Sequence, residues 1–146
     1  ANRGYFITPH VVKEIEDEAL DSLYTAKRYT KVSEKHYETV VQGMRAAVTG
    51  GTCRAANLPG LDVCGKTGTA QNKGKDHSAF MGFAPMNNPK IAVAVYVENG
   101  GWGATYGVPI GALIMEKYLN GTLSPQSEMK ASDIQMRRID YGVHER

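Results

Sequence analysis

The sequence predicts an α+β protein, with a three-stranded antiparallel sheet flanked by one helix before it and one after it. Three apolar, β-prone runs follow one another between residues 61 and 98. Short turns rich in Gly, Asn and Pro separate these runs, and strands joined by such short turns pair antiparallel. Amphipathic helical patterns precede the first run and follow the last.

Length and charge indicate an ordinary globular domain. The chain has 146 residues, of which 42% are hydrophobic and 22% charged, and its net charge is +2. So small a positive balance indicates neither a nucleic-acid partner nor a membrane surface. No apolar run approaches the roughly 20 residues that span a bilayer. Because the sequence begins at Ala1 rather than Met, we expect any targeting or anchoring segment to lie upstream.

The first 32 residues carry weaker signals than the helix that follows them. Residues 5–15 are predicted to be extended, and residues 21–31 to be irregular or a short hairpin. The strongest helix is predicted at residues 33–49, where Ser33 can cap the first turn. Gly50 and Gly51 end it. Its apolar stripe consists of Tyr37, Val40, Val41, Met44, Ala47 and Val48.

The strands are predicted at residues 61–70, 78–84 and 90–98. The third is apolar on both faces, so we expect it to be central in its sheet. A glycine-rich loop at residues 99–107 follows, and then a helix that begins near Pro109 and ends at Gly121.

Candidate chemistry is concentrated near the end of the first strand. Lys66, Thr67 and Thr69 place an ammonium and two hydroxyls there, and Gly65 and Gly68 would let another molecule approach the backbone. Such groups could bind an anion and form hydrogen bonds with a peptide-like substrate. A lysine and threonines at a strand end can also form a solvated edge that only discourages aggregation.

A nucleotide site is an alternative, because Gly60–Thr67 matches the phosphate-loop pattern G-x-x-x-x-G-K-[ST]. Such a loop needs a strand before its first glycine and a helix that opens at the lysine. Here Pro59 precedes the first glycine, and the apolar residues lie between the glycines. We expect neither a metal nor a cofactor, since the histidines and cysteines lack metal-ligand spacing. Cys53 and Cys64 could pair in an oxidising compartment or remain buried thiols.

Four segments resemble the C-terminal part of the transpeptidase domain of class B penicillin-binding proteins, nearest to the elongation type called penicillin-binding protein 2. They are Met44–Thr52, Gly65–Gln71, Phe80–Pro85 and Val95–Gly101, and the resemblance extends from the first residue to about residue 121. It implies a partial penicillin-binding/β-lactamase-like transpeptidase domain at residues 1–123. Residues 124–146 are then a polar tail, either locally helical or disordered.

The family uses three motifs, S-x-x-K with the nucleophile, S-x-N, and K-T-G. Lys66-Thr67-Gly68 matches the third motif. The stretches that begin at Ser22 and Ser33 do not fit the first motif, and S-x-N does not occur in the sequence. Both of these motifs lie upstream in the family. The resemblance therefore implies that the nucleophile is absent from this chain and that the chain alone is inactive.

The resemblance also implies roles for the residues of the K-T-G strand, which lies at a sheet edge beside the active-site cleft. Lys66 would act electrostatically and bind substrate, and Thr67 and Thr69 would donate hydrogen bonds to the substrate carboxylate. Gly68 would leave room for the acyl group. The backbone N–H of Thr69, with that of the nucleophile, would form the oxyanion hole.

Three further residues are assigned to the cleft: Asp76 and His77 to its shape and Trp102 to its rim. The implied ligands are peptidoglycan peptide stems and β-lactams, and the implied partners are a glycosyltransferase and the upstream half of the domain. That half would pair beside the strand at residues 90–98, on the periplasmic face of the bacterial inner membrane. Alone, the chain is expected to be weakly stable or to self-associate by that edge. A noncatalytic interaction domain is the other alternative.

Overall fold

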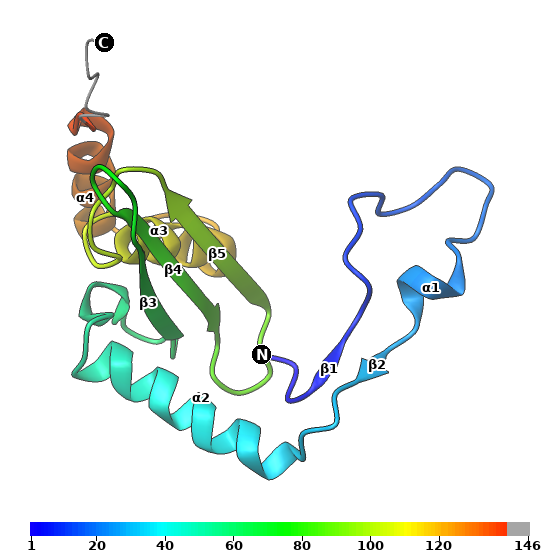
Figure 1. The fold of residues 1–146 in the computed structure, drawn as a ribbon. Helices are drawn as coiled ribbons and strands as arrows, with labels where there is room; N and C mark the ends of the chain where they lie inside the picture. Colours follow the sequence, from blue (N-terminus) through cyan, green and yellow to red (C-terminus); the bar gives the residue numbers. More distant parts are fainter. Residues whose placement is uncertain (140–146) are drawn as a thin grey trace. The chain divides into compact units, whose positions relative to one another are not determined.

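The computed structural model describes residues 1–139, which form two units. The smaller unit is Asn2–Val40, and the larger contains Ala1 and the residues from Val41 onward. Helix α2 (Glu34–Thr49) begins in the smaller unit and ends in the larger one (Figure 1). It begins one residue later than the predicted helix and ends at the same residue.

The smaller unit contains a two-stranded sheet and one turn of helix. β1 (Tyr5–Phe6) pairs antiparallel with β2 (Arg28–Tyr29), so the predicted extended segment forms a strand only over its first two residues. Helix α1 (Ser22–Thr25) begins where the Asp21 carboxylate accepts a hydrogen bond of 2.7 Å from the Leu23 N–H. The expectation of an irregular segment or hairpin at residues 21–31 is wrong here, because this aspartate cap favours a helical turn.

The larger unit is built on an antiparallel sheet in the order β3-β4-β5 (Figure 1). Its strands are β3 (Cys64–Ala70), β4 (His77–Ala84) and β5 (Ile91–Val97), which confirms the predicted meander. The expectation that the third strand is central is wrong within this chain. β4 is central because it belongs to both hairpins, and β5 lies at an edge.

β3 begins three residues later than predicted. Gly60 and Asp62 have φ angles of 74° and 43°, which a strand does not adopt. Arg45 of α2 holds this turn, because its guanidinium donates to the Val63 carbonyl over 3.0 Å and contacts the Asp62 carboxylate at 3.3 Å. Leu61 and Val63 are nevertheless buried, so their apolar character reflects core packing in a turn.

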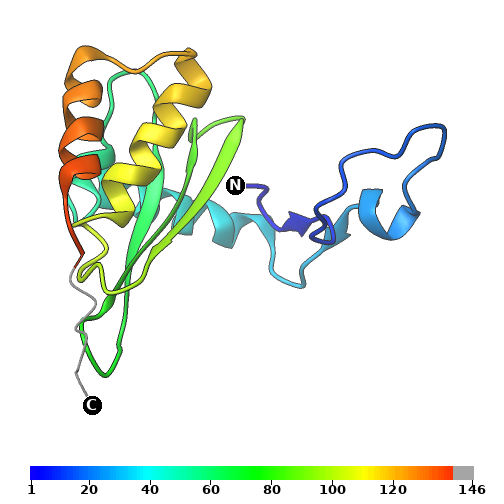
Figure 2. The same ribbon diagram turned by 90° about the horizontal axis from the view of Figure 1, so that it is seen from above.

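Helix α3 (Gly107–Asn120) covers one face of the sheet, and Figure 2 shows it on the same side of the strands as helix α4 (Pro125–Met136). Phe80 is 2% exposed and lies in the core beneath α3. A Cβ built on Gly65 would lie 2.5 Å from the Phe80 ring, and one on Gly82 would lie 2.7 Å away. Gly65 therefore makes room for Phe80, and the prediction that it admits another molecule is wrong.

The opposite face of the sheet is covered only in part by the described residues. Val41 of α2 forms a small buried cluster there with Cys64 and Phe83. Met81 and Tyr96, whose strands β4 and β5 are paired, remain 62% and 58% exposed. This face therefore presents apolar side chains to solvent.

Helix α4 occupies the first half of the predicted tail, for which the sequence left helix and disorder open. Ser124 caps it by accepting a hydrogen bond from the Ser127 N–H. Glu116 of α3 is 4% exposed, and its carboxylate accepts from the Ser124 N–H at 3.1 Å, which ties α4 to α3. Residues 140–146 lie outside the described residues.

The cysteines and the described helices bear on the expectations for a disulfide and for a membrane span. Within the described residues, Cys53 and Cys64 are both buried, and no disulfide joins them. None of the described helices has the length and apolar character needed to span a membrane.

The glycine at position 65 gives a test of the core. Gly65→Ala should lower the free energy of unfolding by about 1–3 kcal/mol, because the added methyl group overlaps the Phe80 ring and forces strain. Gly74→Ala is the matched control, since a Cβ at Gly74 meets nothing within 4 Å. Thermal and denaturant unfolding would measure both variants, and equal stabilities would contradict this account of the packing.

The α3–α4 contact should weaken in acid. Burial acts to raise the pKa of Glu116, but the Ser127 and Ser124 hydroxyls, the Ser124 N–H and the Lys130 charge lower it on balance. The ionised carboxylate thus stabilises the folded chain at neutral pH, and this contribution is lost as the pH falls below about 4.5 and through the folded-state pKa.

Protection of the α4 amides against hydrogen exchange, corrected for the intrinsic rate, would measure this loss. Glu116→Gln should remove most of the acid dependence, because an amide does not titrate. If the Glu116→Gln variant keeps the full acid dependence, a titratable group other than Glu116 causes the loss of protection.

Candidate functional site

The K-T-G segment lies on an edge strand. In the described sheet β3 pairs with β4 alone. Lys66 and Thr69 are exposed, and Thr67 and Gly68 are half-buried. Because side chains alternate along a strand, Lys66 and Gly68 share one face and the two threonines share the other. An edge strand of this kind can offer an ammonium, hydroxyls and backbone groups to an extended ligand.

A hydrogen-bonded cluster joins this strand to the loop after α2. The Lys66 ammonium donates to the Thr67 carbonyl at 2.9 Å and lies 3.5 Å from the Thr67 hydroxyl. The Thr67 hydroxyl is in turn 2.9 Å from the hydroxyl of Thr52. A cation and two hydroxyl groups are thus held together at the edge of the sheet, which suits the binding of a carboxylate.

Cys53 lies beneath this cluster and is fully buried. Burial raises the pKa of its thiol, although the Thr52 hydroxyl, the Thr67 backbone and the Lys66 charge act in the opposite direction. The thiol is therefore protonated at neutral pH, which disfavours a nucleophilic role because the thiolate is the reactive form.

The glycine-rich loop is anchored beside the K-T-G segment. A Cβ on Gly103 would lie 2.6 Å from the Gly68 carbonyl oxygen, so the loop packs directly on β3. Ser78 of β4 is fully buried, and its hydroxyl donates to the Trp102 carbonyl at 2.8 Å and accepts from the Gly107 N–H at 3.0 Å. Sequence reasoning missed this serine, although a lone hydroxyl in an apolar strand is a signal for such a buried anchor.

The residues assigned to the cleft lie at the same end of the sheet. The Asp76 carbonyl accepts from the Gly101 N–H at 2.8 Å, and His77 Nδ1 accepts from the Asn99 N–H at 2.9 Å. Asp76 and His77 therefore fix the start of the glycine-rich loop. Trp102 is 75% exposed, so its indole is not packed by the described residues.

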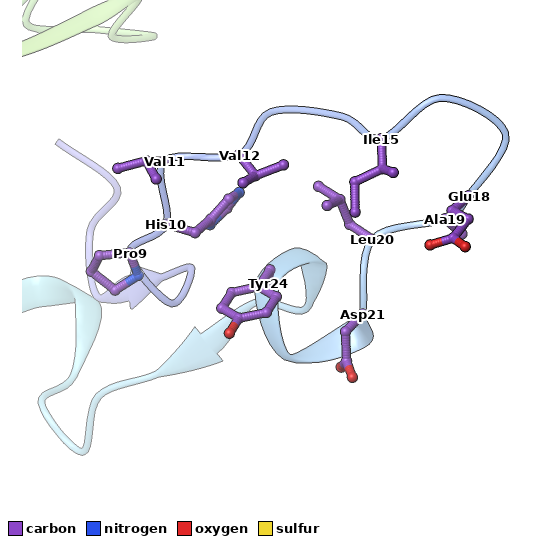
Figure 3. Close-up of a pocket in the computed structure, with 10 residues that line it drawn as sticks. All are labelled: Pro9, His10, Val11, Val12, Ile15, Glu18, Ala19, Leu20, Asp21 and Tyr24. Carbon is purple, nitrogen blue, oxygen red and sulfur yellow. The ribbon is translucent and has the colours of Figure 1, made fainter.

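Two hollows differ in chemistry. One of about 260 Å³ lies on the open face of the sheet, where Lys66 and Gly68 meet Met81, Ala94 and Tyr96. A larger one of about 550 Å³ lies within the smaller unit, and Figure 3 shows that Pro9, Val12, Ile15 and Leu20 are among its lining residues. The hollow in the smaller unit has the larger volume, but only the hollow on the open face adjoins Lys66 and Thr67. We therefore assign the candidate site to the hollow on the open face.

The phosphate-loop alternative is excluded by the position of Lys66. Lys66 and Thr67 lie within β3, and no helix of residues 1–139 begins at this lysine. The helix N-terminus that would face a phosphate in such a loop is thus missing from this segment. In the same described range, no three His, Cys, Asp or Glu side chains gather as a metal site requires.

A formal match to S-x-x-K occurs at Ser127–Lys130 of α4. Ser127 is 1% exposed, and its hydroxyl faces the buried carboxylate of Glu116. A hydroxyl enclosed in this way cannot reach a substrate. Ser127 anchors α4 and is not a candidate nucleophile.

The family described as the penicillin binding protein transpeptidase domain matches residues 1–119, so the chain belongs to that family. Within the family its relatives include class B proteins of the MrdA and penicillin-binding protein 2 type.

Two solved structures and one curated sequence illustrate the similarity. The chain is 31% identical to the peptidoglycan D,D-transpeptidase MrdA of Haemophilus influenzae over 94% of its own length and 24% of that protein. It resembles Pseudomonas aeruginosa PBP2 in complex with WCK 5153, with a TM-score of 0.68, 36% identity, and coverage of 86% and 29% of the two chains. It also resembles the ceftriaxone acyl-enzyme complex of Mycobacterium tuberculosis penicillin-binding protein A, with a TM-score of 0.59 and 30% identity. This match covers 64% of the present chain and 23% of the other.

The buried serine of β4 gives a test of how the loop is held. Ser78→Ala should lower the free energy of unfolding by about 1–3 kcal/mol, because the Trp102 carbonyl and the Gly107 N–H lose a buried partner. Hydrogen exchange should also increase in residues 99–107. Ser132→Ala, at an exposed position of α4, is the control. If both variants matched the unsubstituted protein, Ser78 would not be the anchor.

Proposed function

We propose that this chain supplies the substrate-binding edge of a peptidoglycan D,D-transpeptidase, which cross-links cell-wall peptide stems by serine acyl transfer. The observation that carries the proposal is the position of the K-T-G segment. Lys66, Thr67 and Thr69 lie on an edge strand, next to an open sheet face, in a chain of the transpeptidase family. The chain spans 24% of the length of the Haemophilus relative. In this proposal the nucleophile serine lies in polypeptide upstream of the present sequence.

Each residue of the segment has a distinct task in acyl transfer. The peptide stem extends along β3 and hydrogen-bonds to its backbone, as a strand added to the sheet edge. The Lys66 ammonium raises the local positive potential, and the Thr67 and Thr69 hydroxyls donate to the substrate carboxylate. Gly68 leaves room for the acyl group. The Thr69 N–H, with that of the nucleophile, stabilises the tetrahedral oxyanion, and each such donor is worth roughly 10²–10³ in rate.

β-Lactams are the second class of ligand in this proposal, since they carry an acylating carbonyl and a carboxylate in a similar arrangement. The acyl-enzyme complex that penicillin-binding protein A forms with ceftriaxone supports this extension. We also propose a glycosyltransferase partner and a location at the periplasmic face of the inner membrane, with an anchor upstream of this chain.

The upstream half of the domain is proposed to pair along β5. The outer edge of this strand has no partner among residues 1–139, and Met81 and Tyr96 expose apolar surface on the open face of the sheet. In its absence, exposed strand edges of this kind favour association between copies. The isolated chain is therefore proposed to be inactive and either weakly stable or self-associating.

Acylation by a labelled penicillin tests the function. The full-length protein should be labelled, and a fragment with the present sequence should not. In the full-length protein, Lys66→Ala should slow labelling roughly 10- to 100-fold, because the positive charge that attracts the substrate carboxylate is lost. Lys73→Ala, an exposed lysine in the β3–β4 turn, is the control and should leave the rate unchanged.

Two outcomes would contradict the proposal. Absence of labelling in the full-length protein would favour a noncatalytic interaction domain. If the Lys66 and Lys73 variants are labelled at equal rates, the protein is still a transpeptidase, but Lys66 does not contribute to its site.

A further inference from the structure

The hydroxyl of Thr52 lies 2.9 Å from that of Thr67, although the two residues are 15 positions apart in the sequence. We propose that Thr52 is a positioning residue, which orients the Thr67 hydroxyl so that its proton points at the substrate carboxylate. This inference rests on the proposed function and extends the site to the loop that follows α2.

A threonine hydroxyl can donate only one hydrogen bond, so the direction of the bond between Thr52 and Thr67 decides what remains for a ligand. The Thr67 hydroxyl has a single proton and two lone pairs. If that proton is given to Thr52, none remains for a ligand. If Thr52 donates instead, the Thr67 oxygen accepts, and the Lys66 ammonium at 3.5 Å can donate to its second lone pair. The only proton of Thr67 is then left for the carboxylate.

The backbone on both sides of Thr52 is fixed. The N–H groups of Gly51 and Cys53 both donate to the Ala47 carbonyl, at 3.1 and 2.9 Å. A Cβ on Gly51 would lie 2.8 Å from the Ala47 Cα, so the loop packs closely on the end of α2. The Cys53 side chain is fully buried. Thr52 is therefore presented from a rigid corner of the core, as a residue that must orient a neighbour requires.

The partner hydroxyl is equally constrained. Thr67 is paired with Phe80 in the β3–β4 ladder, and Phe80 is 2% exposed in the core. Two rigid elements thus hold the two oxygen atoms at hydrogen-bond distance before any ligand arrives. This preorganisation lowers the cost of ordering Thr67 when the carboxylate binds.

A double-mutant cycle in the full-length protein tests the inference, with the second-order rate of acylation by a labelled penicillin as the measurement. Thr52→Val keeps the shape of the side chain and removes its hydroxyl, and it should slow acylation about 3- to 10-fold, as expected for one neutral hydrogen bond. Thr52→Ser should restore the rate. In a Thr67→Val background, Thr52→Val should have no further effect, because Thr52 acts only through Thr67. Thr122→Val, at an exposed position after α3, is the surface control.

The outcomes separate this inference from the function on which it rests. No labelling of the unsubstituted protein would overturn the proposed function. If the unsubstituted protein is labelled, three results would overturn only the role of Thr52. They are an unaffected Thr52→Val variant, failure of Thr52→Ser to restore the rate, and additive effects of the two valine substitutions. If Thr52→Val proves unfolded in a thermal melt, Thr52→Ala replaces it and must show the same loss and the same non-additivity.

Discussion

The packing of the Phe80 ring against three glycines is the constraint on which the rest of the larger unit depends. Gly65 and Gly82 come from the sheet and Gly111 from α3, and a side chain on any of them would overlap the ring. Their missing side chains let α3 lie close to the sheet, with Phe80 at the centre of the core. In so dense a core, a small displacement of one element costs energy in its neighbours. The position of β3 relative to α3 is thereby fixed.

This constraint reaches the candidate site directly, because Gly65 immediately precedes Lys66. Thr67 is the ladder partner of Phe80, so the backbone that carries the hydroxyl proposed for carboxylate binding is paired with a buried residue of the core. On the other side, Gly103 packs on the backbone of β3, and Ser78 fixes the loop that carries it. A site built on strands and supported by buried contacts keeps its geometry better than one built on mobile loops.

The two faces of the sheet have different consequences. The face beneath α3 is closed by the described residues, whereas the other face leaves Met81 and Tyr96 largely exposed beside Lys66. Large apolar side chains gathered on one surface mark a place of interaction. In the proposed enzyme the rest of the transpeptidase domain covers this surface, and the substrate binds beside it, along the edge of β3. Lys66 faces this surface, whereas the Thr67 and Thr69 side chains lie on the other face of β3, so the proposed site follows the strand edge between the two faces.

Local signals were enough to predict the helix at residues 33–49, the three antiparallel strands and the K-T-G segment, because each depends on periodicity, turn chemistry or contiguous residues. Three features could be seen only once the chain was packed: β4 is central, Leu61 and Val63 are buried in a turn, and Gly65 makes room for Phe80 in the core. Packing also brought Thr52 to Thr67 and Ser78 to the glycine-rich loop. These contacts join residues distant along the chain, and no local pattern specifies which buried groups meet once the helices and the sheet pack together.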